Sequence, residues 1–456
     1  MNTSDSASSR PSPHRQVVVT RKVVDASRIQ VPFKPPRHRR VVVTGIGLVT
    51  PFACDRETSW QAILQGDKSV RRVEGTDRTP CWIGAPAPSE LWLNSAILGD
   101  EFAPWRHDIT NDPVIAMALQ AAFDAVTDAA LNRSKEDADR RGCVIGTSKP
   151  GLRSIGRALL AGPDFEVDDW SRCWPNSAAQ AVAQLVNANG PLLSPVAACA
   201  TGLVSILRGA DLIRSDECDV VLAGSSDASL TPIVLGSFQR LGVLAREGTD
   251  PATACRPFDA SRSGFVIGEG AAVLVLESLD SAVSRDAKIY AELLTGGMAC
   301  DPSGITQVDP EGTSLSWLIS DVLHRAGLTP AEINYINLHG TATRANDVAE
   351  TRAVRTAFGS AANRVLCSSQ KGAIGHLLGA AGSVETALTL LAIRDQVAPP
   401  TVNLTTPDPH CDLDYVPETS RPTTIRHAMK LSLGFGGHLA AAVFRRLEKS
   451  KPGDRE

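Results

Sequence analysis

Residues 194–202, with the sequence SPVAACATG, place a cysteine where a short apolar run meets a predicted helix. Apolar side chains recur at three- and four-residue steps from Leu203 to Ile213, which is the spacing of a buried helix. A cysteine at a helix N-terminus faces unpaired backbone N–H groups and the positive end of the helix dipole, and both favour the nucleophilic thiolate. The stretch predicts that Cys199 attacks an acyl group, whereas a lone cysteine in this setting is more often an inert core residue.

The composition of the whole chain limits the classes of protein that fit. The chain of 456 residues is long enough for one large domain or two fused units, and its hydrophobic content of 43% supports a sizeable core. A net charge of −4 gives no general affinity for nucleic acid. The ten cysteines form no C-x-x-C pair and no metal-like spacing, so we expect a reducing compartment. No apolar run approaches the length of a membrane span.

The alternation of predicted strands and helices indicates an α/β protein. Residues 1–38 are rich in Ser, Pro and Arg and lack a secretory signal, so they fit either a disordered tail or an organelle transit peptide. From residue 40 onward, apolar strands alternate with amphipathic helices in two series that meet near residues 285–295. This rhythm predicts largely parallel sheets buried on both faces.

Two later stretches supply candidate acid–base groups. His339 lies in NLHGTAT at 337–343, just after a predicted strand, and ligands of α/β proteins sit at strand ends. Lys371 and His376 lie in the glycine-rich stretch 368–382, and a lysine among so many small residues needs a partner if it is buried. Glu350 is a candidate partner. Taken singly, each histidine also fits a core position and the lysine also fits a surface loop.

A fourth stretch, LGFGGH at residues 433–438, surrounds one aromatic with glycines. Such a loop can aim the backbone N–H of Phe435 at an oxyanion while the ring acts as a movable plug. A core phenylalanine in a strand turn would give the same pattern.

The order of these four motifs resembles the β-ketoacyl-ACP synthases of the thiolase fold, and most closely the elongating synthases I and II. The resemblance covers about residues 40–447. It implies two related α/β halves in a layered α-β-α-β-α architecture. The nucleophile would lie in residues 39–290 and the histidine pair in residues 291–447, and a polar tail would follow at 448–456.

The resemblance also implies a role for each matched residue. Cys199 matches the acyl-accepting nucleophile, and His339 with His376 matches the pair that drives decarboxylation of a malonyl extender. Loss of CO₂ leaves an enolate, whose oxygen needs hydrogen-bond donors. The carbanion then attacks the Cys199 thioester and yields a β-ketoacyl product.

Three further matches support that chemistry. Lys371 matches the active-site lysine, and Glu350 the acidic residue that pairs with it. Phe435 matches the gating phenylalanine, whose N–H forms the oxyanion hole together with that of Cys199. The reaction implies no metal and no redox cofactor.

Three positions depart from the family pattern and are expected to line the pocket. Leu433 stands where the elongating enzymes have a second phenylalanine, and His438 replaces a threonine or asparagine. Lys149 lies in a segment that borders the acyl pocket in the family. It fits either a solvated interface position or a short, polar or polyene-type acyl group.

Two alternatives and the expected partners complete the hypothesis. A thiolase would carry a second reactive cysteine in the C-terminal glycine loop, where this chain has none. A non-catalytic partner subunit like a chain-length factor would lack the nucleophile. The resemblance implies an acyltransferase that forms a homodimer in the cytoplasm, unless residues 1–38 target an organelle. Its partner would be an acyl carrier protein, in fatty-acid or polyketide synthesis.

Overall fold

The computed structural model describes most of the chain from residue 39 onward. The expected tail at 1–38 lies outside the described residues, as does residue 449 onward of the expected polar tail. The described ranges are 39–73, 82–89, 103, 105–134, 137–162, 171–246, 248 and 250–448.

The described strands of the core form one sheet in the order β10-β9-β13-β14-β8-β1-β7-β6-β4-β5. One half of this order comes from the first part of the chain: β1 (Val41–Val49), β4 (Arg141–Gly146), β5 (Leu192–Leu193), β6 (Val220–Asp227) and β7 (Gly270–Ser278). The other half comes from the second part: β8 (Ala291–Cys300), β9 (Tyr335–Asn337), β10 (Leu366–Ser368), β13 (His427–Gly434) and β14 (His438–Arg445).

The sheet is mixed, so the prediction of largely parallel sheets is wrong. Strand β1 runs antiparallel to both β7 and β8, and β14 runs antiparallel to both β13 and β8. Parallel pairing is confined to β4 with β5 and β6, and to β9 with β10 and β13. The alternation of strands and helices along the chain did not indicate these antiparallel pairs. One of them, β13 with β14, is a hairpin whose strands are joined by only three residues.

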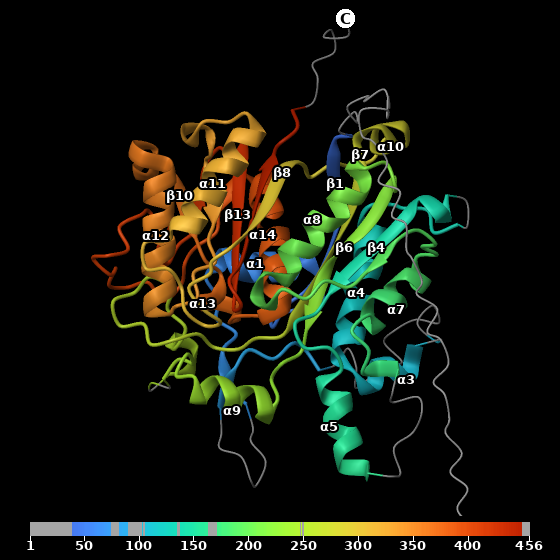
Figure 1. The fold of residues 1–456 in the computed structure, drawn as a ribbon, viewed down its shortest axis with the longest axis horizontal. Coiled ribbons are helices and arrows are strands. Elements are labelled where there is room, and N and C mark those ends of the chain that lie inside the picture. The colour runs from blue at the N-terminus through green and yellow to red at the C-terminus, as the bar shows by residue number, and fades with distance from the viewer. Residues whose placement is uncertain are drawn as a thin grey trace, which may run out of the picture. The chain divides into compact units, whose positions relative to one another are not determined.

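Helices pack on the outer face of each half of the sheet, and two further helices lie between the halves (Figure 1). On one outer face α4 (Pro113–Asp128) and α7 (Ser177–Leu185) pack on the strands of the first half. On the other, α11 (Thr313–Ala326) packs on β8 and β14 beside α12 (Arg344–Phe358). Helices α8 (Thr201–Arg214) and α14 (Ala381–Asp395) pack on each other and on strands of both halves. The expected α-β-α-β-α layering is confirmed.

Local sequence signals account for several helix ends. Pro113 occupies the first turn of α4, and the Asp112 carboxylate caps it by accepting from the Val114 N–H. Gly327 ends α11 in the left-handed conformation, which glycine adopts readily. The shorter helices are α1 (Arg56–Gln65), α3 (Arg106–Asn111), α5 (Leu152–Ala161), α9 (Pro232–Arg240), α10 (Leu279–Ser284) and α13 (Lys371–Ile374). Within the described part of the chain, no helix is both long and apolar enough to cross a bilayer.

A glycine contact brings the two central helices together. A Cβ on Gly202 would lie only 2.2 Å from the Ser383 backbone nitrogen, so α8 can approach α14 this closely only with glycine there. Ser225 and Ser383 then share a buried hydrogen bond of 2.6 Å beside the contact. The close approach places the first turn of α8 next to the segment that carries His376.

Candidate active site

Cys199 lies in a short 3-10 turn, Ala198–Ala200, and α8 begins at Thr201 rather than at the cysteine itself. Ala198 has φ 46°, a left-handed conformation that a non-glycine residue holds only when its surroundings enforce it. The Thr201 hydroxyl accepts from the Ala197 N–H at 2.8 Å and donates to the Ala198 carbonyl at 2.7 Å. The nucleophile turn is therefore held by the first residue of the helix.

His339 follows β9 directly, and its main chain is fixed by ionic side chains. Its N–H donates to Glu350 Oε1 at 2.6 Å, and the N–H of Gly340 donates to Glu350 Oε2 at 2.8 Å. Its carbonyl accepts from Lys371 Nζ at 2.5 Å. The ring is buried at 4% exposure, so its orientation is set by protein contacts.

His376 is fixed by main-chain pairing and by an aromatic contact. Its N–H donates to the Val266 carbonyl at 2.6 Å, and its carbonyl accepts from the Gly268 N–H at 2.9 Å. The ring meets Phe265 edge to face, with centroids 5.1 Å apart, and the His339 ring in the same way at 5.3 Å. The two histidines predicted from separate motifs therefore lie side by side.

Both histidines are neutral at neutral pH. Burial lowers the pKa of each ring well below its ordinary value, and the charge of Lys371 lowers it further. In the described residues, neither buried Nδ1 has a hydrogen-bond partner. Both residues line the cavity, and Nε2 is the ring nitrogen outside the group of buried, unpartnered atoms, so it is the nitrogen available to donate to an oxyanion.

The ionisation of Cys199 differs from the sequence-based expectation. Burial raises the pKa of the thiol to about 11, although the charges of Lys149 and Lys371 and the N–H of Phe435 each lower it. The helix begins two residues later than expected, and the half-buried Cys199 packs against an apolar cluster that includes Phe265, Ile267 and Leu378. The cost of burying a thiolate therefore outweighs these favourable contacts.

The predicted pairing of Lys371 with Glu350 is wrong. Lys371 Nζ instead forms an ion pair with Glu385 Oε1 at 2.5 Å, and both side chains are almost completely buried. Glu350 holds the backbone of His339 and Gly340. Sequence reasoning missed Glu385. Its carboxylate lies in the apolar part of α14 and was a usable signal, because a buried charge requires a partner.

The glycine loop after β13 packs directly on the nucleophile turn. A Cβ on Gly434 would lie 2.7 Å from the Ala197 carbonyl oxygen and 3.1 Å from the Cys199 nitrogen. The Phe435 N–H hydrogen bonds to Cys199, and the Phe435 ring lies 6.2 Å from that of Phe238. Gly436 and Gly437 have φ of 86° and 76°, which give the loop its turn.

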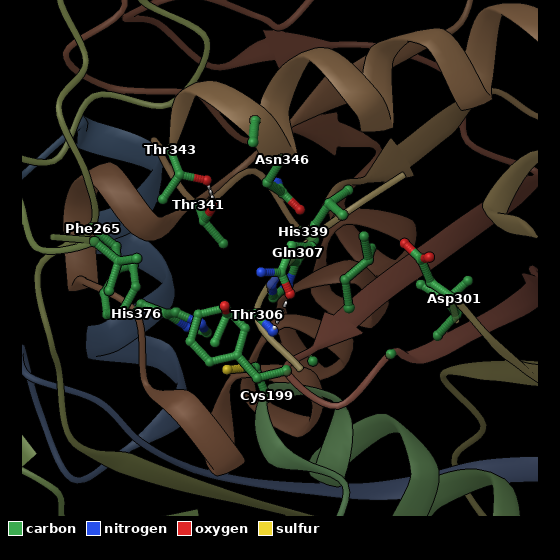
Figure 2. A pocket seen from close by; sticks show the side chains of 18 of the residues that line it. Cys199, Phe265, Asp301, Thr306, Gln307, His339, Thr341, Thr343, Asn346 and His376 are labelled. Atoms are coloured by element: carbon green, nitrogen blue, oxygen red, sulfur yellow. Dashed lines mark hydrogen bonds between the residues drawn. The ribbon is translucent and has the colours of Figure 1, made fainter. Parts of the chain in front are cut away.

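These residues surround a cavity of about 140 Å³. Figure 2 shows Cys199, His339 and His376 around this space, with Phe265 beside His376. Among the three pocket positions expected from the sequence, Leu433 lines the cavity. The cavity lining does not include Lys149, whose Nζ lies 5.6 Å from the centroid of the Phe238 ring, or His438, which is exposed at the start of β14.

The fold and site define a class: an α/β enzyme of the thiolase-like fold in which one cysteine and two neutral histidines meet at a cavity. Two family profiles match the chain, Beta-ketoacyl synthase, N-terminal domain over residues 38–282 and Beta-ketoacyl synthase, C-terminal domain over residues 290–405. The chain belongs to the β-ketoacyl synthase family, and it is a condensing enzyme of the acyltransferase type.

Individual relatives agree with this assignment. The 3-oxoacyl-[acyl-carrier-protein] synthase 2 of Coxiella burnetii is 36% identical over 416 residues, which cover 90% of this chain and 99% of that protein. A ketosynthase solved in complex with its type II polyketide synthase acyl-carrier protein and bound to the hexaketide has a TM-score of 0.82 and 33% identity. That match covers 90% of this chain and 100% of the solved chain. The ishigamide ketosynthase/chain length factor has a TM-score of 0.79 and 29% identity, with the same coverage. The resemblance inferred from the motifs is confirmed.

Proposed function

We propose that the chain joins a Cys199-bound acyl group to a malonyl unit carried by an acyl carrier protein, with loss of CO₂. The observation that carries the proposal is the meeting of Cys199, His339 and His376 at one cavity, with the Phe435 N–H directed at the thiol. The product would be a β-ketoacyl thioester, formed in fatty-acid or polyketide synthesis.

In the first half-reaction, the Cys199 sulfur attacks the acyl thioester and the carrier thiol leaves with the proton that the cysteine loses. The carbonyl oxygen becomes negative, and in this proposal it accepts hydrogen bonds from the N–H groups of Cys199 and Phe435. Each such donor is typically worth about 3 kcal/mol of transition-state stabilisation.

In the second half-reaction, the C–C bond to the malonyl carboxylate breaks and CO₂ leaves. The electron pair forms an enolate, whose oxygen accepts from the Nε2–H groups of His339 and His376. The enolate carbon then attacks the acyl carbonyl, and the Cys199 thiolate is released and takes up a proton. Lys371 acts on this step by holding the His339 carbonyl.

A basic groove supports an acidic carrier protein as the partner. It has a volume of about 710 Å³ and shares Val243, Thr343 and Ala345 with the active-site cavity. Arg246 and Arg344 line it with exposed side chains. Guanidinium groups at this rim suit both the acidic surface and the phosphate of a carrier arm.

An edge strand supports a homodimer. β5 ends the sheet order, and its Leu192 and Leu193 are each 39% exposed, with Val196 at 54% nearby. An apolar, unpaired edge is stabilised when a second copy covers it.

We further propose that the chain is built from halves 39–290 and 291–447, which divide the sheet between β1 and β8. We also propose that it acts in the cytoplasm.

The proposal is tested by intact-protein mass after incubation with acyl carrier thioesters from acetyl to long-chain and unsaturated groups. We expect a single acyl adduct on Cys199 and a β-ketoacyl product once malonyl carrier is added. Absence of any adduct on the folded protein would favour the partner-subunit alternative and overturn the proposal.

Lys149 is proposed to assist ionisation of Cys199. We also propose that it influences which acyl group is accepted, through the Phe238 ring, which lines the cavity although Lys149 itself does not. Its Nζ donates to the Ser148 hydroxyl at 2.8 Å and lies over the Phe238 ring. Because its charge lowers the pKa of Cys199, Lys149→Met should raise that pKa further and move the pH profile of iodoacetamide alkylation to higher pH. At pH 8 we expect alkylation on the order of fivefold slower, the equivalent of about 1 kcal/mol of charge interaction.

Lys149→Arg is the matched control, because it keeps the charge and should keep the profile. The methionine variant should also accept longer saturated chains than the unmodified protein does. An unchanged alkylation profile together with an unchanged chain preference would remove Lys149 from the site.

A further inference from the structure

A second completely buried lysine, Lys430, lies on the strand that leads into the glycine loop. It is 0% exposed in the middle of β13, opposite Asn337 of β9, and thus beside the strand that ends just before His339. It does not line the active-site cavity, and its position outside the four motifs kept it out of the sequence analysis.

Glu385 is shared between the two buried lysines. Its Oε1 lies 2.5 Å from Lys371 Nζ, and its Oε2 lies 2.7 Å from Lys430 Nζ. The carboxylate comes from α14, whereas the lysines come from α13 and β13. A buried charge persists only with such partners, so the three side chains act as one unit.

This unit holds the main chain on both sides of His339. Lys430 Nζ donates to the Leu431 carbonyl at 2.5 Å and, more weakly, reaches the Leu338 carbonyl at 3.5 Å. Lys371 donates to the next carbonyl, that of His339, and Glu350 receives the His339 N–H. Successive peptide groups around the histidine are therefore fixed by charged side chains from different elements.

We propose that Lys430 is a positioning residue for the decarboxylation half-reaction, because it shares Glu385 with Lys371 and braces the turn that carries His339. The inference rests on the proposed function and extends it to a residue outside the cavity. Lys430 acts through His339 and touches neither the acyl group nor the malonyl group.

The charges around Lys430 agree with this role. Two lysines face two carboxylates, Glu385 and Glu350, and Asp347 lies beside Glu350 with its own partner, Arg262. Burial lowers the pKa of Lys430, while Glu385 and Glu350 oppose that effect. The ammonium in turn lowers the pKa of both His339 and His376, so it favours the neutral rings.

The test compares Lys430→Met with the unmodified protein in the two half-reactions, measured separately. Acylation of Cys199 from an acyl carrier thioester should stay within about twofold, because the hydrogen bonds and the ion pair of Lys430 go to Leu338, Leu431 and Glu385, none of which belongs to the nucleophile turn. Decarboxylation of malonyl carrier should fall on the order of 10²-fold, which is the effect of a small misplacement of a reacting group. Exposed Lys68→Met is the matched control and should change neither rate.

The pH profile separates positioning from a general loss of structure. Loss of the Lys430 charge raises the histidine pKa values, so the acid limb of decarboxylation should move to higher pH. Lys430→Arg should return the limb toward its original position. Lys430→Gln keeps a hydrogen-bond donor for the two carbonyls without the charge, so it should show the shifted limb even if the methionine variant fails to fold.

Equal losses in acylation and decarboxylation would overturn the inference, as would an unchanged decarboxylation rate and acid limb in both Lys430→Met and Lys430→Gln. If the unmodified protein neither accepts an acyl group nor decarboxylates malonyl carrier, the proposed function itself fails, and the inference fails with it. These results are distinguishable because each variant is read against the unmodified protein in both assays.

Discussion

Cys199→Ala is expected to abolish acyl transfer and condensation, with a loss of at least about 10⁴-fold in rate, because Cys199 is the one cysteine among the described residues that lines the cavity. Cys143, Cys255 and Cys367 are buried, and burial raises the pKa of each thiol, so none of them can substitute. Intact-protein mass would show no acyl adduct, and product assays would show no β-ketoacyl thioester.

The companion variant Cys199→Gln separates the two half-reactions. A glutamine amide is similar in shape and polarity to the acylated cysteine, so malonyl decarboxylation should persist or increase while condensation is lost. The control is thermal unfolding, which should be close to that of the unmodified protein for both variants. Condensation retained by Cys199→Ala would contradict the nucleophile assignment.

Cys199, His339 and His376, which the sequence singled out from separate motifs, line one cavity because each follows a strand or precedes a helix, and element ends meet at one edge of the sheet. Phe435 was predicted from the glycines around it, because a tight turn or a close backbone contact requires glycine. The structure shows such a contact, since Gly434 packs on the turn that holds Cys199. A sequence motif was therefore sufficient to predict a site residue where the backbone of that same motif forms part of the site.

The ion-pair partner of Lys371 could not be predicted from a sequence motif in this way. Glu350 is closer to the motif of His339 in sequence, whereas Glu385 is one turn inside α14 and faces Lys371 only after the helices pack. The prediction of strand direction failed for two reasons. The β13–β14 hairpin is local, but a rhythm of alternating strands and helices does not indicate it, and the pairing of β1 with β8 joins strands far apart in the sequence.

The state of Cys199 shows a third limit. Position near a helix start predicted a thiolate, but the thiol in the folded protein has its pKa raised by burial. Acyl transfer therefore requires that the proton leave as sulfur attacks, and any cation near the sulfur lowers the cost of that step. Lys149 and Lys371 are the two cations that do so here.

His376→Ala is expected to remove malonyl decarboxylation while Cys199 still accepts an acyl group. The His376 ring supplies one of two N–H donors for the enolate oxygen, and loss of such a donor costs on the order of 10²–10³-fold. The acyl oxyanion uses backbone N–H groups instead, so acylation measured by intact-protein mass should remain within a few-fold.

The comparison with His339→Ala sharpens this division of labour. His339 lies within the Lys371–Glu385–Lys430 network, whereas His376 is held by main-chain pairing and by Phe265. Both alanine variants should lose decarboxylation, and His376→Ala should leave the ionic network, and hence thermal stability, closer to that of the unmodified protein. If acylation disappears together with decarboxylation in folded His376→Ala, the His376 ring also serves the nucleophile, and the proposed division of labour between the two half-reactions is wrong.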